Sequence, residues 1–413
     1  MRTIAASGLI ALTAMLGVAA SVTVAGPATA TTTAAPAKAA KAAPPANELF
    51  GVSCVSSKHC VAAGLNENAE TSVKGGGALI QTWNGKSWST VAPKAPTGAL
   101  SASLLGVSCT STTACVAVGV YLNPSGFGVP LAERWNGRTW TPSAPPRAAG
   151  SSFGQLNGVS CTSAKSCVAV GSFGTATGAV ALAESWNGSK WTLSRPPAPK
   201  GSVVADLNKV SCRSSSYCIA VGSSSTNTAD FALAERWNGR SWSRLSVQPP
   251  STGKHETNLT GVSCSSAKSC VAVGTGTAAA GKPGGLTSFA EFWNGRTWTA
   301  GKIGWPRGTS NAYLVGVSCP AAKSCVAVGY VNINISDGGR TGRAAAIRWN
   351  GKTWSATTVP APGKGKTSRF NEVSCRAASS CVAVGQLGPF NSDEGSSLAG
   401  FWNGKSWKLA TTP

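Results

Sequence analysis

The chain is short of acidic residues and of the residue types used most often in catalysis and metal binding. Its 413 residues include two His, two Met and 14 Asp plus Glu, and charged residues make up only 12%. So few imidazoles and carboxylates leave little material for a metal site or for general-base chemistry. The composition also excludes an acidic disordered protein, a coiled coil and a membrane protein with several spans. We therefore expect neither a metal nor a cofactor.

Glycine and positive charge are abundant instead. The chain contains 49 Gly and 36 Lys plus Arg, which gives a formal net charge of +22. Many small residues favour short strands with tight turns over a helix-rich enzyme. Length alone allows two or three domains, and 42% hydrophobic residues can supply a core.

The first residues have the pattern of a secretory signal peptide, predicted over 1–30. Arg2 precedes a mildly apolar run from Ile4 to Ala25, and Ala28-Thr29-Ala30 is a small-x-small cleavage site. Residues 31–46 are rich in Ala, Pro and Lys, as in a flexible tether. We expect a secreted protein, extracellular or associated with the cell wall, with no transmembrane segment after cleavage. The alternative is a retained membrane anchor, which the Ser, Thr and Gly within the run disfavour.

Two motifs alternate seven times along residues 47–413. The first reads Gly-Val-Ser-Cys, five residues and Cys-Val-Ala-Val-Gly, and the second reads Trp-Asn-Gly-x-x-Trp. Successive copies lie 51 to 56 residues apart, and the pattern contains all 14 Cys and 14 of the 15 Trp. Each copy holds four strand-sized pieces, with Asn-Gly as a hairpin turn between the last two.

This period predicts an all-β fold, a seven-bladed β-propeller with four antiparallel strands per blade. The alternative is a string of small independent β-domains, but a unit of this size with one short core rarely stands alone. The chain enters at the first strand of blade 1 and leaves at the fourth strand of blade 7. Side-chain packing between these two blades must then close the ring, and we expect a monomer.

The cysteines predict one disulfide within each blade. The count is even, the protein is exported, and each pair flanks a short turn that places two antiparallel strands at bridgeable distance. Metal binding is the alternative, but the spacing is not Cys-x-x-Cys, and His59 and His255 are the only histidines. The predicted pairs are Cys54–Cys60, Cys109–Cys115, Cys161–Cys167, Cys212–Cys218, Cys264–Cys270, Cys319–Cys325 and Cys375–Cys381.

Other repeated residues have structural interpretations. Recurrence of the Trp pairs at equivalent positions indicates packing between blades rather than carbohydrate stacking by all fourteen. An acidic residue precedes the first Trp by two positions in four consecutive blades, and we expect these carboxylates to pair with neighbouring Arg or Lys. They are Glu133, Glu184, Glu235 and Glu291.

The repeat resembles the propeller repeats of photosystem II assembly factors. The resemblance lies in three consecutive segments, Leu-x-Gly-Val-Ser-Cys, Cys-Val-Ala-Val-Gly and Leu-Ala-Glu-Arg-Trp-Asn-Gly-Arg-Thr-Trp. The repeat is also similar to the Asp-box repeats of sialidase-like proteins, whose box lies on the turn between the third and fourth strands. Two features depart from those repeats: Asn replaces the box Asp, and cysteines stand where Phe and Gly are usual. The resemblance implies the fold but no particular activity. By resemblance alone, an assembly factor for another exported protein is a further hypothesis.

The sequence favours a binding or adhesion protein that recognises a cell-envelope polymer, a polysaccharide or another protein. Loops between second and third strands, and links between blades, vary on a constant scaffold and open on one face. A secreted glycan-cleaving enzyme is the alternative, although no nucleophile motif or phosphate loop is present. Trp305 breaks the repeat and is expected to stack on ligand, unless it fills a gap between two blades. The candidate ligand-binding residues are Trp305, Arg307, Tyr313, Tyr121, Phe127 and Tyr330.

Basic residues recur in the turns expected on the opposite face. Each Asn-Gly turn carries one, which predicts a ring that attracts polyanions, with no dedicated nucleic-acid site. The alternative is that these residues only keep the protein soluble. They are Lys86, Arg138, Lys190, Arg240, Arg296, Lys352 and Lys405, and the cysteine turns add Lys58, Lys165, Arg213, Lys268, Lys323 and Arg376.

Overall fold

The computed structural model describes residues 46–66, 77–91, 93–247, 257–277, 286–306, 309, 311–334, 340–363, 365–389 and 395–413. The predicted signal peptide, and the predicted tether except for its last residue, lie outside these ranges.

The described residues form 28 β-strands and no helix. The strands follow one another in groups of four, which we call units 1 to 7. Units 1 and 2 are β1 (Asn47–Ser56), β2 (His59–Asn66), β3 (Gly77–Trp83), β4 (Trp88–Val91), and β5 (Ser101–Ser111), β6 (Ala114–Leu122), β7 (Gly128–Trp135), β8 (Trp140–Pro142). Units 3 and 4 are β9 (Gly154–Ser163), β10 (Ser166–Thr175), β11 (Gly178–Trp186), β12 (Trp191–Ser194), and β13 (Val204–Ser214), β14 (Tyr217–Ser225), β15 (Asp230–Trp237), β16 (Trp242–Leu245).

The remaining strands complete units 5 to 7. Unit 5 is β17 (Thr257–Ser266), β18 (Ser269–Thr277), β19 (Leu286–Trp293) and β20 (Trp298–Gly301). Unit 6 is β21 (Asn311–Ala321), β22 (Ser324–Asn334), β23 (Arg340–Trp349) and β24 (Trp354–Thr357). Unit 7 is β25 (Lys366–Ala377), β26 (Ser380–Pro389), β27 (Ser396–Trp402) and β28 (Trp407–Thr411).

Within each unit the strands pair in chain order and antiparallel. Units 1, 2, 5, 6 and 7 are separate four-stranded sheets, whereas one parallel bridge between Ala179 and Val204 joins units 3 and 4 into an eight-stranded sheet. No strand is exchanged between units among the described residues. The predicted complete four-strand units are therefore present.

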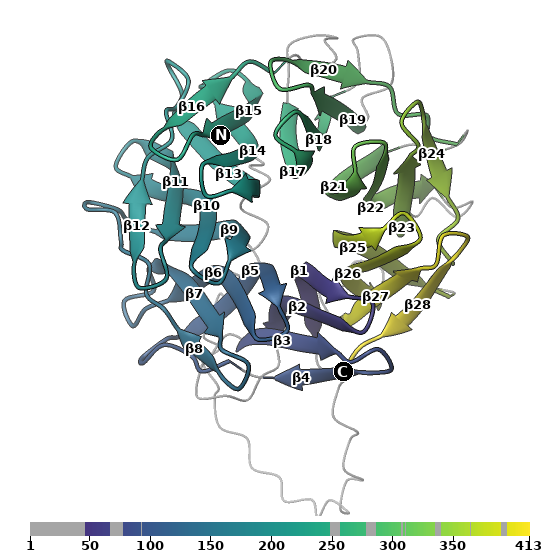
Figure 1. The fold of residues 1–413 in the computed structure, drawn as a ribbon, viewed down its shortest axis with the longest axis horizontal. Helices are drawn as coiled ribbons and strands as arrows, with labels where there is room; N and C mark the ends of the chain where they lie inside the picture. The colour runs from purple at the N-terminus through teal and green to yellow at the C-terminus, as the bar shows by residue number, and fades with distance from the viewer. Residues whose placement is uncertain are drawn as a thin grey trace, which may run out of the picture.

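The units are arranged around a central axis, with first strands innermost and fourth strands outermost (Figure 1). The first strand of each unit packs against that of the next, and β25 packs against β1. Each hydrophobic cluster combines residues from two neighbouring units; Leu49 and Trp88 of unit 1, for example, share a cluster with Val384 and Ala399 of unit 7. A single unit cannot bury its own apolar face, so the core lies between units.

The seven predicted disulfides are confirmed, one in each unit. In unit 1, Cys54 lies directly opposite Cys60 in the β1–β2 register, and their Cα atoms are 4.0 Å apart. The structure describes no free cysteine. Loops this short each contribute about 2 kcal/mol of stability by restricting the unfolded chain.

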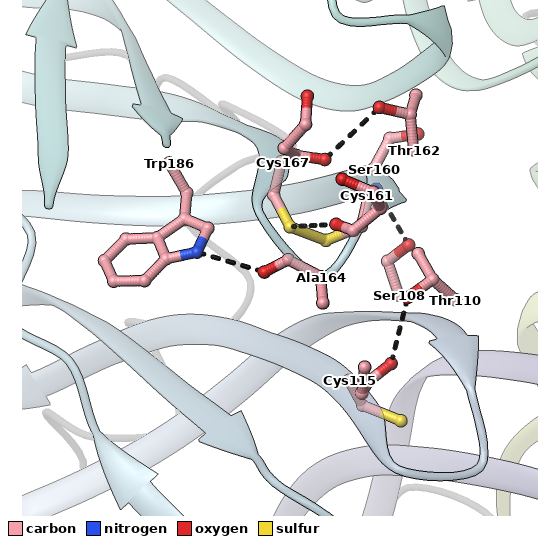
Figure 2. The surroundings of a disulfide bond; sticks show 12 residues. Ser108, Thr110, Cys115, Ser160, Cys161, Thr162, Ala164, Cys167 and Trp186 are labelled. Carbon is pink, nitrogen blue, oxygen red and sulfur yellow. Dashed lines mark hydrogen bonds between the residues drawn. A yellow bond between two sulfur atoms is a disulfide. The ribbon is translucent and has the colours of Figure 1, made fainter. Parts of the chain in front are cut away.

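The paired tryptophans are structural. Their ring centroids lie 5.4 to 5.7 Å apart in every unit. Figure 2 shows the first Trp of unit 3, Trp186, donating its indole N–H to the carbonyl oxygen of Ala164 in the cysteine turn, at 3.3 Å. The second Trp, Trp191, donates to the hydroxyl of Ser143 in unit 2, at 3.0 Å. The pair thus fastens the outer hairpin to the inner one and to the preceding unit.

The serine of Gly-Val-Ser-Cys bonds to the next unit. Ser108 Oγ accepts the backbone N–H of Cys161 at 3.0 Å (Figure 2). The same bond, at 2.9 to 3.0 Å, occurs at all seven junctions, including the junction between unit 7 and unit 1. The other donor–acceptor pairs are Cys54–Ser374, Cys109–Ser53, Cys212–Ser160, Cys264–Ser211, Cys319–Ser263 and Cys375–Ser318.

The expectation that the repeated glutamates pair with Arg or Lys is wrong. Glu133, Glu184, Glu235 and Glu291 are at most 1% exposed, and none forms an ion pair with a described residue. Both carboxylate oxygens of Glu184 lack a hydrogen-bond partner among the described residues. Burial raises the pKa of Glu133, Glu184 and Glu235 to about 8, and that of Glu291 to about 7. These side chains face the apolar interior, where the neutral acid is the favoured form.

Candidate functional site

The ring has two chemically different ends. Because successive strands are antiparallel, the β1–β2 and β3–β4 turns of unit 1 lie at one end, and the β2–β3 loop and the link to β5 lie at the other. A Cβ built on Gly85 of the outer turn would lie 2.9 Å from Cγ of Lys58 in the cysteine turn, so the two turns touch. Equivalent turns touch in every unit. We call these the turn end and the variable end.

The first strands meet at a narrow axis. Each first strand places one residue at or near this axis, and we call the position of that residue the axial position. A Cβ added to axial Gly51 would lie 3.0 Å from Cα of axial Gly106, so glycine permits this close approach. The axial residues in chain order are Gly51, Gly106, Gly158, Lys209, Gly261, Gly316 and Glu372.

An ion pair crosses the axis. Lys209 of unit 4 and Glu372 of unit 7 replace the axial glycine, and Lys209 Nζ lies 2.8 Å from Glu372 Oε2. Both side chains line a cavity of about 70 Å³ together with axial glycines of units 1, 2, 3 and 5. The two units lie on different sides of the ring (Figure 1), so this pair spans the axis.

Three residues before each axial position, toward the variable end, the chain carries a different side chain in every unit. We call these seven residues the rim. The next residue is fully buried Leu or Phe in every unit, from Leu49 to Phe370. The apolar core residue therefore holds each first strand in place, while the rim residue before it differs from unit to unit. The rim consists of Glu48, Ser103, Gln155, Asp206, Asn258, Tyr313 and Arg369.

Rim residues of units 7 and 1 form a charged network. Arg369 binds Glu48 through two nitrogens, with Nε–Oε1 at 3.0 Å and Nη2–Oε2 at 2.7 Å. Asn371 Nδ2 donates to Glu48 Oε1 at 2.7 Å and to the carbonyl oxygen of Leu49 at 2.9 Å. A bidentate Arg–carboxylate pair fixes both groups in one plane. The network also bridges the first and last units.

Amide side chains bridge units 3, 4 and 5 in the same way. Asn157 Nδ2 donates to Asp206 Oδ1 at 2.9 Å and to the carbonyl oxygen of Leu207 at 3.0 Å. Asn208 Nδ2 donates to Asn258 Oδ1 at 2.9 Å. Burial raises the pKa of Asp206 to about 6, against hydrogen bonds from Ser172 and Asn157 that lower it. Planar polar groups thus hydrogen-bond across the junctions of units 3, 4 and 5 at the rim.

Two of the predicted ligand-binding aromatics lie together on this rim. Tyr313 and Tyr330 are opposite each other in the β21–β22 register, and their rings stack with centroids 4.5 Å apart. Burial raises the pKa of Tyr330 to about 12, and the charge of Arg369 acts in the opposite direction. Sequence reasoning missed Arg369, Glu48 and the amides. Aligning the seven first strands on their Gly-Val-Ser-Cys motifs and comparing two register positions, three residues and one residue before the axial position, would have found them.

The other predicted ligand-binding residues are not gathered with this pair. Trp305 is half-buried and packs on the cluster that contains Val271, Leu314 and Trp354, from units 5 and 6. Its indole nitrogen is buried without a described hydrogen-bond partner. Tyr121 packs on the cluster between units 1 and 2, and Phe127 is 49% exposed before β7. Arg307 lies outside the described residues.

Large exposed apolar side chains occur only at the variable end of the part that the structure describes. Leu100 and Val203 occupy equivalent places in the links before β5 and β13, where each donates its backbone N–H to the end of the second strand. Phe127 and Phe231 flank the loops between second and third strands of units 2 and 4. The variable end therefore presents both the polar rim and these apolar groups.

The turn end is basic. The seven Asn-Gly-turn cations predicted from the sequence are all exposed, as are the six in the cysteine turns. In unit 1, Asn84 Oδ1 accepts the backbone N–H groups of Lys86 and Ser87, each at 2.9 Å. The turn backbone is satisfied internally, which leaves the cationic side chain as the group that can reach a partner.

Neither a metal cluster nor a membrane-spanning helix is found in the described ranges. No three His, Cys, Asp or Glu side chains there come together as a metal-binding group. No helix of the described chain is long and apolar enough to cross a membrane.

The chain resembles solved structures, although no known family model and no curated protein matches its sequence. The GH74 xyloglucanase of Xanthomonas campestris is 13% identical over 87% of this chain, with a TM-score of 0.50. This chain spans about half of that protein, 54% of its length. The β-propeller domain of the Trilobed protease from Pyrococcus furiosus is 8% identical over 88% of this chain and 97% of that domain, with a TM-score of 0.50.

At these identities the similarity shows the fold alone. The repeated four-stranded sheets around an axis, together with these structures, identify the architecture as that of a β-propeller. Seven disulfides are typical of a protein that matures in an oxidising compartment.

Proposed function

We propose that the protein is a secreted, closed seven-bladed β-propeller that binds a polysaccharide of the cell envelope at the rim of its variable end. The observation that carries this proposal is the rim itself: seven different side chains at one register position of an otherwise repeated strand. Positions that only hold the scaffold, such as the buried Leu or Phe beside each rim residue, vary little. Four rim residues are at most 8% exposed, so the partly exposed Asn258, Tyr313 and Arg369 are the ones that a ligand would contact. Variation on a constant scaffold is characteristic of a recognition surface.

The rim chemistry suits a sugar. Polysaccharides offer many hydroxyl groups and apolar ring faces, which planar amides, carboxylates, guanidinium groups and aromatic rings recognise together. Arg369, Glu48 and Asn371 provide such planar groups beside the stacked Tyr313 and Tyr330. These residues are held by neighbouring units, so ordering them on binding costs little conformational entropy.

The state of the carboxylates favours binding over cleavage. Glycoside hydrolysis usually requires two carboxylates that flank the scissile bond. Among the described residues, Glu48 is held by Arg369 and Asn371, Glu372 is held by Lys209, and Asp206 accepts from Asn157. The four repeated glutamates are buried between sheets, three residues before the Asn of each Asn-Gly turn.

Screening of cell-envelope polysaccharide fractions on an array tests this proposal. We expect a defined fraction to bind, and the E48Q/R369Q variant to lose at least tenfold in affinity for it. The matched control is K209Q/E372Q, which removes the axial ion pair between β13 and β25, with Glu372 three residues after Arg369 on β25, and should leave affinity unchanged. Absence of binding to every fraction would contradict the proposal. Release of new reducing ends that the rim variant abolishes would instead support the glycan-cleaving alternative.

A further inference from the structure

The turn end carries positive charge that the described residues do not balance. We infer that this end is a second interaction surface, which docks on a linear anionic glycopolymer while the rim stays free at the opposite end. The inference does not rest on the proposed sugar site, because it concerns different residues at the other end of the ring.

None of the described acids lies in the turns that form the turn end. Glu48, Asp206 and Glu372 lie on first strands at the rim or axis, and Asp230 begins β15 at the variable end. The repeated glutamates are buried between units. By contrast, neither set of turns contains Asp or Glu, and their basic residues form no described ion pair. The positive field at this end is therefore uncompensated by nearby protein charge.

Contacts between turns place the cations in close groups. In unit 1 the aliphatic stem of Lys58 lies against Gly85, beside Lys86. Lysines of the cysteine turns pack on the glycine of the Asn-Gly turn in the same way in units 3, 5 and 6, at Lys165, Lys268 and Lys323. Each of these four units presents two adjacent cations, whereas Thr or Ser stands at the contact in units 2, 4 and 7, and every unit presents the cation of its Asn-Gly turn. Such a surface matches a chain that carries a charge on every repeat, because successive charges can meet successive units.

Other side chains at this end favour a glycopolymer over nucleic acid or a membrane. Binding of single-stranded nucleic acid uses exposed aromatic rings for base stacking, whereas the indoles near these turns pack on each other at a tilt and the first of each pair donates to a turn carbonyl. Membrane-surface proteins insert large apolar groups, but among the described residues the large apolar side chains that are exposed all lie at the variable end. The turns are instead rich in Ser, Thr and Asn, which can bond to hydroxyl groups of a sugar.

The experiment compares binding of the full protein to polygalacturonate and to its fully methyl-esterified form. The two polymers share a backbone and differ in charge. We expect binding to the acid form, none to the ester, and at least a tenfold loss of affinity between 50 and 200 mM salt, because surface charges are screened over about 10 Å at 0.1 M.

Two charge-matched variants locate the surface. The turn variant carries K86Q, K190Q, K352Q and K405Q. The control carries K94Q, K200Q, K302Q and K366Q, exposed lysines at the variable end that lie in links between units or, for Lys366, at the start of β25. Both lose four charges. We expect the turn variant to lose at least tenfold in affinity for polygalacturonate and the control to stay within twofold.

Three outcomes would overturn the inference. The first is an equal loss of affinity in both variants, which would indicate attraction by net charge alone. The second is binding that salt does not weaken. The third is tighter binding to oligothymidylate or to anionic phospholipid vesicles than to polygalacturonate at equal charge concentration. Sugar-array binding at the rim is measured separately with neutral polysaccharides, so failure of one surface does not imply failure of the other.

Discussion

Ser374 of the last unit accepts a hydrogen bond from the backbone N–H of Cys54 in the first unit, at 3.0 Å. This bond has the same partners and length as those at the six other junctions. The first and last units therefore meet as any two consecutive units do, although no strand passes between them. The Glu48–Arg369 pair adds a contact at the same junction.

Removal of this hydroxyl should destabilise the protein. S374A leaves the N–H of Cys54 without a partner, and we expect a loss of about 1 to 3 kcal/mol in the free energy of unfolding. S108A, at an internal junction, should cost about the same, and S57A in an exposed turn should cost nothing measurable. Denaturant unfolding gives all three values. An S374A variant as stable as the wild type would mean that the junction is open in solution.

The buried glutamates should make stability fall as pH rises. The pKa of Glu184 is about 8 in the folded protein, against 4.5 for the free side chain. The folded state therefore holds a proton that the unfolded state releases, so the stabilisation is complete below pH 4.5 and is lost as pH rises toward 8. E184Q should weaken this pH dependence and stabilise the protein at pH 8.

Glutamine is a suitable replacement because Gln81 occupies the equivalent buried position in unit 1. Unfolding midpoints of E184Q and wild type should agree near pH 4 and diverge near pH 8. If both proteins show the same pH dependence, Glu184 does not titrate in this range and the assignment of its pKa is wrong.

The axial ion pair should show energetic coupling. K209M leaves Glu372 without its cation in a narrow cavity, and E372Q leaves Lys209 without its anion. Each single variant should lose about 1 to 3 kcal/mol, and the double variant should lose less than the sum by about 1 kcal/mol or more. Additive losses in a double-mutant cycle would show that the two charges do not interact in solution.

Trp305 should act as a packing residue of the junction between units 5 and 6. It contacts the cluster of those units, so W305A should lower the free energy of unfolding by about 1 to 3 kcal/mol. Binding to the polysaccharide fraction selected on the array should be retained. Loss of that binding with unchanged stability would restore the hypothesis that this indole stacks on ligand. F127A, at an exposed site without cluster contacts, serves as the stability control.

The sequence by itself determined the repeat, the order of strands and the disulfides. Cys54 and Cys60 flank a short turn between apolar strands, and such local geometry leaves one sensible pairing. The Asn-Gly turns likewise depend on a few adjacent residues. These features follow from short-range physical chemistry, which repeats wherever the motif repeats.

Only the tertiary structure decided which residues meet across units. The pairing of Glu48 with Arg369 spans 321 positions, and that of Lys209 with Glu372 crosses the axis. The burial of Glu184 contradicts the ion pair that its sequence neighbours suggested, because the carboxylate lies on the face of β11 that Leu182 and Trp186 pack against the preceding unit rather than in solvent. Such contacts depend on how the units pack around the axis. A motif fixes the shape of one unit, but the packing of units decides what each side chain faces.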